Sequence, residues 1–258
     1  MVKSVLLSQW NLRIPCKVSE PEDGLIQRVV LGVHGLGGSA MDDIQTSLAE
    51  EMNLFYSAVV RFDFPAHGEN PMDDSAFTVR NCVDTLITVS RWAKEQYPQV
   101  TDLCIFATGF GAYITLLALE ELLELPGQVK LVVQTPSMRM DETLLAMTRM
   151  TADSLFALDQ ITIHAQRPFE LSYSFYEDLQ ANSVMTDYPI PMLILQGEKD
   201  DYIRMADIQM FRQMNEQSKL VIIPGASHRF LEDGAWDMVL DLTRDWFEFE
   251  QVLCCDWE

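Results

Sequence analysis

The chain has 258 residues, of which 39 are acidic and 18 basic, so its formal net charge is −21. Such an acidic surface repels nucleic acid and anionic lipid, and we expect neither as a partner. Hydrophobic residues make up 48% of the sequence, which is enough for a large core, but no run approaches the ~20 apolar residues of a membrane span. We therefore expect one domain over residues 1–258, soluble and cytoplasmic.

Cysteine and histidine spacing gives no sign of a metal. The five cysteines, including the vicinal pair Cys254 and Cys255, follow no regular spacing, which argues against a disulfide framework or a zinc site. The four histidines show no metal-ligand spacing either. Neither a P-loop nor a G-x-G-x-x-G turn follows a predicted strand, so we expect no nucleotide and no cofactor. The oligomeric state stays open.

Predicted strands and helices alternate through the first half of the chain. VVLGVH is a continuous run rich in β-branched residues, typical of a buried parallel strand, and Pro98 and Pro126 stop the helices before them. The predicted strands are Val2–Ser8, Leu12–Val18, Val29–His34, Ser57–Asp63, Leu103–Thr108 and Val129–Thr135. The predicted helices are Met41–Met52, Phe77–Tyr97 and Ala112–Leu125.

The alternation resumes near the C-terminus with strands Met192–Gln196 and Leu220–Ile223 and helices Met205–Asn215 and Leu231–Phe249. This order predicts an α/β fold, with a mostly parallel twisted sheet and helices on both faces. Ligands of such sheets bind at the carboxyl ends of the strands, which is where we look for chemistry.

A long insertion, residues 141–188, interrupts the alternation after the sixth strand. It contains helical stretches at Glu142–Met150 and Tyr173–Asn182 and many large apolar side chains. A segment of this length within a domain is typical of a cap or lid. Tyr173 and Phe175 within it, and Met138 just before it, are the candidate substrate-binding residues of an apolar or aromatic pocket.

Two loops follow the first buried strands. The sequence HGLGG, from His34 to Gly38, allows a sharp turn whose amides point into the crevice. An oxyanion hole at such a place takes one amide from this loop and one from the residue after the nucleophile, here Leu36 and Phe110. In the next loop, RFDFPAHG, we expect His67 to have a structural role.

The turn after strand Leu103–Thr108 reads ATGFG and matches the small-residue pattern of a G-x-S-x-G nucleophile elbow. The nucleophile position itself holds Gly109, which has no side chain. Thr108 precedes that position by one residue and should point elsewhere. Cys104 lies within the strand and should be buried. We expect neither to replace the serine.

An acid and a histidine follow the last two strands. Asp200 comes three residues after Gly197, which makes it the candidate triad acid in preference to Asp201. His228 lies in PGASH, the loop before the last helix. The order nucleophile, acid, histidine at successive strand ends is a specific pattern for a hydrolase triad.

These motifs give the chain a resemblance, over nearly its whole length, to the α/β-hydrolase superfamily, and within it to bacterial cinnamoyl/feruloyl esterases and serine-aminopeptidase-like hydrolases. The resemblance implies an α/β-hydrolase fold with a Ser-His-Asp ester hydrolase site and a cap that holds the acyl or aromatic part. Asp200 and His228 match the family positions, whereas Gly109 departs from them. The stretches that carry the resemblance are VHGLGGS, RFDFPAHGEN, FATGFGAY, LILQGEKDDYI and IPGASHRF.

Three hypotheses follow from this pattern. In the first, the chain is an esterase-type protein whose nucleophile is absent, by nature or by engineering, so that only slow hydrolysis by a water activated by His228 remains. In the second, it is a non-catalytic protein that binds a small ester or an apolar or aromatic ligand. In the third, which we favour least, the acidic surface and the methionine-rich insertion bind a protein partner.

Overall fold

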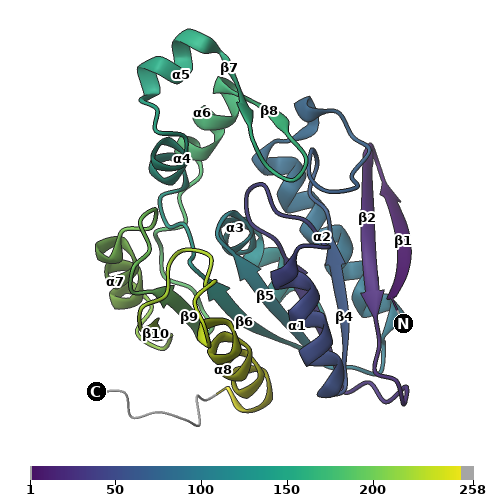
Figure 1. Ribbon diagram of the computed structural model, residues 1–258. Helices are drawn as coiled ribbons and strands as arrows, with labels where there is room; N and C mark the ends of the chain where they lie inside the picture. The colour runs from purple at the N-terminus through teal and green to yellow at the C-terminus, as the bar shows by residue number, and fades with distance from the viewer. Residues whose placement is uncertain (1, 251–258) are drawn as a thin grey trace.

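The computed structural model describes residues 2–250, so Cys254 and Cys255 lie outside the described residues. An eight-stranded sheet in the order β1-β2-β4-β3-β5-β6-β9-β10 forms the centre of the molecule (Figure 1). Its strands are β1 (Val2–Gln9), β2 (Leu12–Ser19), β3 (Arg28–Val33), β4 (Ser57–Phe62), β5 (Asp102–Thr108), β6 (Gln128–Gln134), β9 (Met192–Gly197) and β10 (Lys219–Ile223).

The sheet is antiparallel at one edge and parallel elsewhere. β1 pairs with β2 and β2 with β4 in antiparallel register, which places both strands predicted at the start of the chain in the sheet. From β4 through β3, β5, β6, β9 and β10 every pairing is parallel. The carboxyl ends of these six strands therefore all lie at the same end of the sheet.

Helices cover both faces, as predicted. Leu48 of α1 and Val239 of α8 pack with Phe106 on one face of the sheet. Leu86 of α2 and Ile114 of α3 belong to the core on the other face. Figure 1 shows α1 and α8 in front of the sheet and α2 and α3 behind it. The helices outside the insertion are α1 (Asp43–Leu54), η1 (Asp74–Ala76), α2 (Val79–Gln96), α3 (Phe110–Leu123), α7 (Met205–Met214) and α8 (Ala235–Phe249).

Several helix ends differ from the predicted ones because local capping decides them. α1 begins at Asp43 rather than Met41, since the side chain of Asp42 accepts a 2.8 Å hydrogen bond from the amide of Gln45. α8 begins at Ala235 rather than Leu231, since Gly234 adopts a left-handed conformation with φ +75°. The apolar spacing from Leu231 onward predicted helix, but the backbone turns at the glycine.

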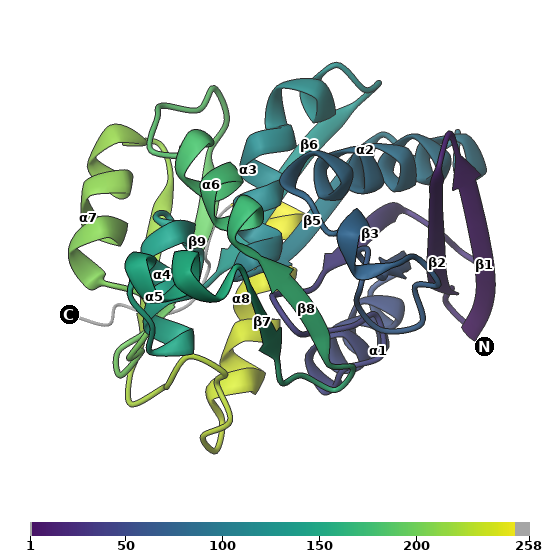
Figure 2. The same ribbon diagram turned by 90° about the horizontal axis from the view of Figure 1, so that it is seen from above.

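The insertion begins with α4 (Met140–Thr148) and ends with α6 (Tyr173–Ala181), which correspond to the two predicted helices. Between them lie α5 (Ala152–Leu158) and an antiparallel hairpin of β7 (Gln160–Ile163) and β8 (Phe169–Ser172), neither of which was predicted. Seen from above, the hairpin and α6 lie over the carboxyl-end region of the central strands (Figure 2). None of the described helices is long and apolar enough to cross a membrane.

Candidate functional site

The glycine-rich loop after β3 makes a tight turn at the edge of the crevice. The amide of Gly38 donates to the carbonyl of Gly35 at 3.0 Å, and Gly37 has a positive φ of +75°. Within the described part of the chain, the amide of Leu36 donates to no acceptor. A backbone N–H without an acceptor can serve a ligand oxygen.

The turn between β5 and α3 holds Gly109 in a conformation that favours glycine. Its φ is +48° and its ψ is −112°. Its amide donates to the carbonyl of Gln134 at 3.0 Å, and its carbonyl accepts from the amide of Tyr113 at 3.2 Å. A β-carbon built on Gly109 would have no neighbour within 4 Å. Residue 109 thus faces open space, with its backbone fixed from both sides.

Two other glycines bring this turn and the glycine-rich loop into backbone contact. A β-carbon on Gly111 would overlap the carbonyl oxygens of His34 and Val33. A β-carbon on Gly35 would lie 3.4 Å from the carbonyl oxygen of Thr108. Phe110 is the first residue of α3, so its amide has no acceptor in the helix ladder and lies at the positive end of the helix dipole. The structure therefore brings the loops that carry Leu36 and Phe110 together.

The loops after β9 and β10 join Asp200 to His228. Nδ1 of His228 lies 2.8 Å from Oδ2 of Asp200, and the Asp200 side chain is only 1% exposed. Oδ1 of Asp200 accepts from the amides of Tyr202 at 2.9 Å and Ile203 at 3.0 Å. Gln196 donates from Nε2 to Oδ2 at 3.0 Å. Four hydrogen bonds thus fix this carboxylate.

These contacts affect the ionisation of Asp200 and orient the ring of His228. Burial by itself raises the pKa of Asp200, but the hydrogen bonds from His228 and from the amides of Ile203 and Tyr202 outweigh it, so the pKa lies below its ordinary value. An ionised carboxylate only accepts, so Nδ1 of His228 carries the hydrogen. Nε2 of His228 then is free to accept, and no described residue donates to it. The ring of Tyr202 stands edge-on to His228 with centroids 5.2 Å apart.

Gln196 was not predicted as a site residue, although its side chain contacts the candidate acid. The sequence offers one signal for it, a glutamine near the end of the otherwise apolar strand MLILQG, and the structure shows that this glutamine is buried. Such a side chain needs a partner, and here Asp200 supplies it.

The other histidines of the crevice are fixed in neutral forms by their neighbours. Nε2 of His67 accepts from the amide of Gly37 at 3.0 Å, and Nδ1 meets the carbonyl of Pro65 at 2.9 Å. Burial lowers the pKa of His67 to about 3. Nε2 of His34 accepts from the amide of Phe64 at 3.2 Å. These contacts give both rings structural roles.

Neither neighbour proposed as a substitute nucleophile is suited to that task. Cys104 is fully buried in β5, and burial raises the pKa of its thiol to about 12. A thiol in that state is not ionised at neutral pH and does not attack. Thr108 is the last residue of β5, and its Oγ1 lies 3.4 Å from a β-carbon built on Gly35, so it faces the glycine-rich loop.

The hairpin of the insertion contacts the glycine-rich loop. A β-carbon on Gly37 would lie 3.0 Å from the β-carbon of Ala165. Ser39 donates from its hydroxyl to Gln166 at 3.3 Å. Arg167 donates to the carbonyl of Asn70, and the amide of Glu170 donates to Asp74 at 2.9 Å. The hairpin therefore covers the glycine-rich loop and the segment of residues 70–74.

The three candidate substrate-binding residues lie in different surroundings. Phe175 is buried and stacks on Phe77 with centroids 4.5 Å apart, within an aromatic cluster that includes Phe110. Tyr173 packs on Phe156 in the outer part of the insertion. Met138 lines a cavity of about 240 Å³ between α4 and α7, and Tyr202 lines the same cavity. Their substrate-binding role stays a prediction.

The α/β-hydrolase family model matches residues 30–242. The chain belongs to this family. No curated protein sequence matches it. Among residues 2–250, no group of three or more His, Cys, Asp or Glu side chains is arranged to hold a metal ion.

Solved structures of this family share the fold at low sequence identity. Est1E from Butyrivibrio proteoclasticus, solved with ferulic acid bound, is 19% identical with a TM-score of 0.79, over 97% of this chain and 100% of that one. Alpha/beta hydrolase domain-containing protein 10 from mouse is 13% identical with a TM-score of 0.76, over 96% and 100%. Dienelactone hydrolase from Anabaena variabilis is 19% identical with a TM-score of 0.64, over 96% and 97%.

Proposed function

We propose that the chain is an α/β-hydrolase of carboxylic-ester hydrolase type, that its crevice binds small acyl or aromatic esters, and that Gly109 occupies the nucleophile position. The observation that carries this proposal is the conformation of Gly109. Its positive φ and the open space at its missing side chain are what a nucleophile elbow provides for a serine. The hydrogen-bonded pair of Asp200 and His228 stands at the same edge of the sheet.

The absence of a hydroxyl at residue 109 determines the chemistry. Without it no acyl-enzyme forms, and the two-step covalent route is closed. A water in the free space can give its proton to Nε2 of His228 while its oxygen attacks the ester carbon. The amides of Leu36 and Phe110 would hold the resulting oxyanion, and the departing alkoxide would take the proton from His228. A triad protease without one triad member retains ~10³–10⁴-fold over water, so we expect slow hydrolysis only.

Replacing the glycine tests the proposal. We expect Gly109→Ser to raise hydrolysis of short-chain and aromatic esters by orders of magnitude and to become labelled by a fluorophosphonate probe, detected by mass spectrometry. The matched control is Gly109→Ala, which adds the β-carbon without the hydroxyl and should stay inactive and unlabelled. If Gly109→Ser folds and neither hydrolyses these esters nor reacts with the probe, the esterase-type site is refuted.

A second candidate function is non-catalytic binding of a small apolar or aromatic ligand. The cavity of about 240 Å³ favours it, because Tyr202 joins that cavity to His228. The water route and pure binding differ in one measurement. If the wild-type chain hydrolyses esters slowly, His228→Ala should abolish that rate. If ester or acid ligands bind saturably and His228→Ala leaves the hydrolysis rate unchanged, the chain is a binding protein.

A further inference from the structure

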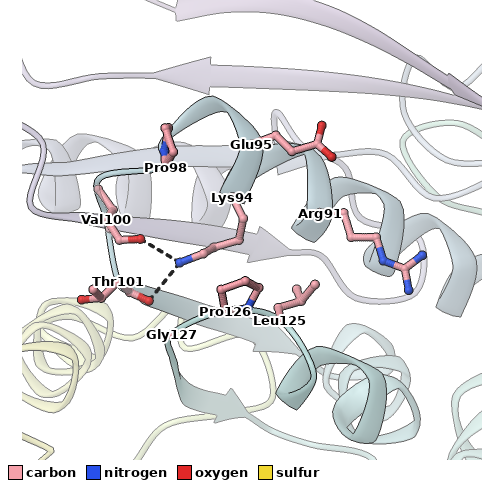
Figure 3. A pocket seen from close by; sticks show the side chains of 9 residues that line it. All are labelled: Arg91, Lys94, Glu95, Pro98, Val100, Thr101, Leu125, Pro126 and Gly127. Atoms are coloured by element: carbon pink, nitrogen blue, oxygen red, sulfur yellow. Dashed lines mark hydrogen bonds between the residues drawn. The ribbon is translucent and has the colours of Figure 1, made fainter.

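A larger cavity, of about 430 Å³, lies at the amino ends of β5 and β6. Gly109 follows the carboxyl end of β5, so the cavity and the candidate site lie at opposite ends of the strands. Its walls are the last turns of α2, the loop Pro98–Thr101 before β5, and the loop Leu125–Gly127 before β6 (Figure 3). β5 has seven residues, so about 23 Å separates this cavity from Gly109. Its volume lies within the ~300–1000 Å³ of small-molecule sites.

Lys94 of α2 places a positive charge in this cavity. Its ammonium donates to the carbonyls of Val100 at 2.7 Å and Thr101 at 3.0 Å, and Figure 3 shows both bonds. An ammonium has three donors, so one remains. Among residues 2–250, Lys94 has no carboxylate within ion-pair distance, whereas Lys17 has one and Lys130 has two. The two carbonyls fix the ammonium of Lys94 at the cavity and leave its charge unpaired.

Leu125 and Pro126 give the cavity an apolar wall, and the charged residues Arg91 and Glu95 also line it. Figure 3 shows Leu125 and Pro126 between the ammonium of Lys94 and the side chain of Arg91. Arg91 lies one turn earlier on α2 and is half-exposed, with its guanidinium 3.7 Å from Glu121. Burial lowers the pKa of Lys94, the charge of Asp102 opposes this in part, and a bound anion would oppose it further.

We propose that this cavity binds a small monocarboxylate with an apolar body, its carboxylate on the Lys94 ammonium and its body on Leu125 and Pro126. The single remaining donor suits one carboxylate oxygen. The apolar wall distinguishes such a ligand from inorganic phosphate, which needs several donors and no wall. This site is independent of the ester site at Gly109.

Amide chemical shifts of the full-length wild-type chain test the site directly. With 3-phenylpropionate as the probe, we expect saturable shifts at Thr101, Asp102 and Gly127, whether or not Gly109 and His228 also shift. The neutral 3-phenylpropanamide should bind at least about tenfold more weakly, and inorganic phosphate should not compete. Shifts confined to the crevice, or none at the cavity up to concentrations on the order of 10 mM, would overturn the proposal.

Substitutions and competing ligands test the Lys94 charge and the apolar wall separately. Lys94→Gln keeps a donor for one carbonyl and should weaken binding at least about tenfold. Lys219→Gln, on the edge strand β10 and outside the cavity lining, should leave binding unchanged. Arg91→Gln changes only a half-exposed side chain and should weaken binding by no more than about threefold. Equal affinity for acid and amide refutes the role of the ammonium, even if Lys94→Gln does not fold. Competition by phosphate refutes the role of the wall.

Discussion

Nε2 of His67 accepts a hydrogen bond from the amide of Gly37 at 3.0 Å, which ties the loop after β4 to the glycine-rich loop after β3. The ring is also in contact with Phe169 of the insertion, with centroids 4.5 Å apart. Only the neutral ring can accept this bond while Nδ1 donates to Pro65. One buried imidazole therefore joins three segments that border the crevice.

The first prediction concerns acid stability. The pKa of His67 falls from 6.5 to about 3 on burial, so the folded chain binds fewer protons than the unfolded chain between these values. Stability therefore rises with pH over this window and is lost as pH falls from 6.5 towards 3. We expect the free energy of unfolding of the wild type, measured with urea, to lose roughly 1.5 kcal/mol more than that of His67→Gln between pH 6.5 and pH 5. Parallel pH curves for the two proteins would contradict this.

The second prediction compares three glycines. Gly109→Ala and Gly24→Ala each add a β-carbon in open space at positive φ, so each should cost about 1 kcal/mol of stability through backbone strain. Gly111→Ala should cost about 3 kcal/mol or more, because its β-carbon meets the carbonyls of β3. Thermal or urea unfolding measures all three. A cost at Gly109 as large as at Gly111 would show that the space beside residue 109 is filled.

The third prediction concerns the acid of the candidate triad. In the Gly109→Ser background, Asp200→Asn should lower kcat by about 10⁴-fold, because an amide in that place no longer fixes the hydrogen on Nδ1 of His228. Asp201→Asn, which changes the exposed neighbouring residue, is the matched control and should leave kcat nearly unchanged. Steady-state ester hydrolysis distinguishes the two. Equal losses of kcat in both variants would show that Asp200 does not act as the triad acid.

The fourth prediction concerns the attachment of the insertion. Asp74 accepts from the amide of Glu170 at 2.9 Å, and Arg167 lies 3.8 Å from the same side chain. Asp74→Ala should therefore increase hydrogen exchange at Glu170 and through the hairpin β7–β8. Asp73→Ala removes only the local cap on Ser75 and should leave the hairpin unchanged. If both variants exchange like the wild type, the contacts of Asp74 do not hold the hairpin in place.

The sheet could be predicted because its strands are buried on both faces and therefore form continuous apolar runs, such as VVLGV in β3. The helix ends were harder to predict, because a single capping residue such as Asp42 or a left-handed residue such as Gly234 sets where a helix begins. The hairpin of the insertion was missed although Phe169 and Leu171 are buried while Glu170 between them is exposed. Four-residue strands give too few repeats of that alternation to stand out from a loop.

Candidate site residues could be predicted where a residue type with a specific chemical role lies in the loop directly after a strand. The loop positions of Asp200 and His228 placed them at one edge, and the structure joins them by a hydrogen bond. Contacts that depend on the conformation of a turn, or on packing between distant segments, were not predictable. The contact of Gln196 with Asp200 depends on the turn after β9, and the burial of Phe175 depends on packing against Phe77.

Glycine at residue 109 also affects how freely the rest of the chain can vary. A serine with φ near +48° carries backbone strain on the order of 1 kcal/mol that glycine does not. Proteins lie close to the stability they need, so this difference sets how many destabilising substitutions the chain tolerates. With glycine there, the chain can absorb roughly one further destabilising substitution of about 1 kcal/mol before its stability falls to that of a serine form.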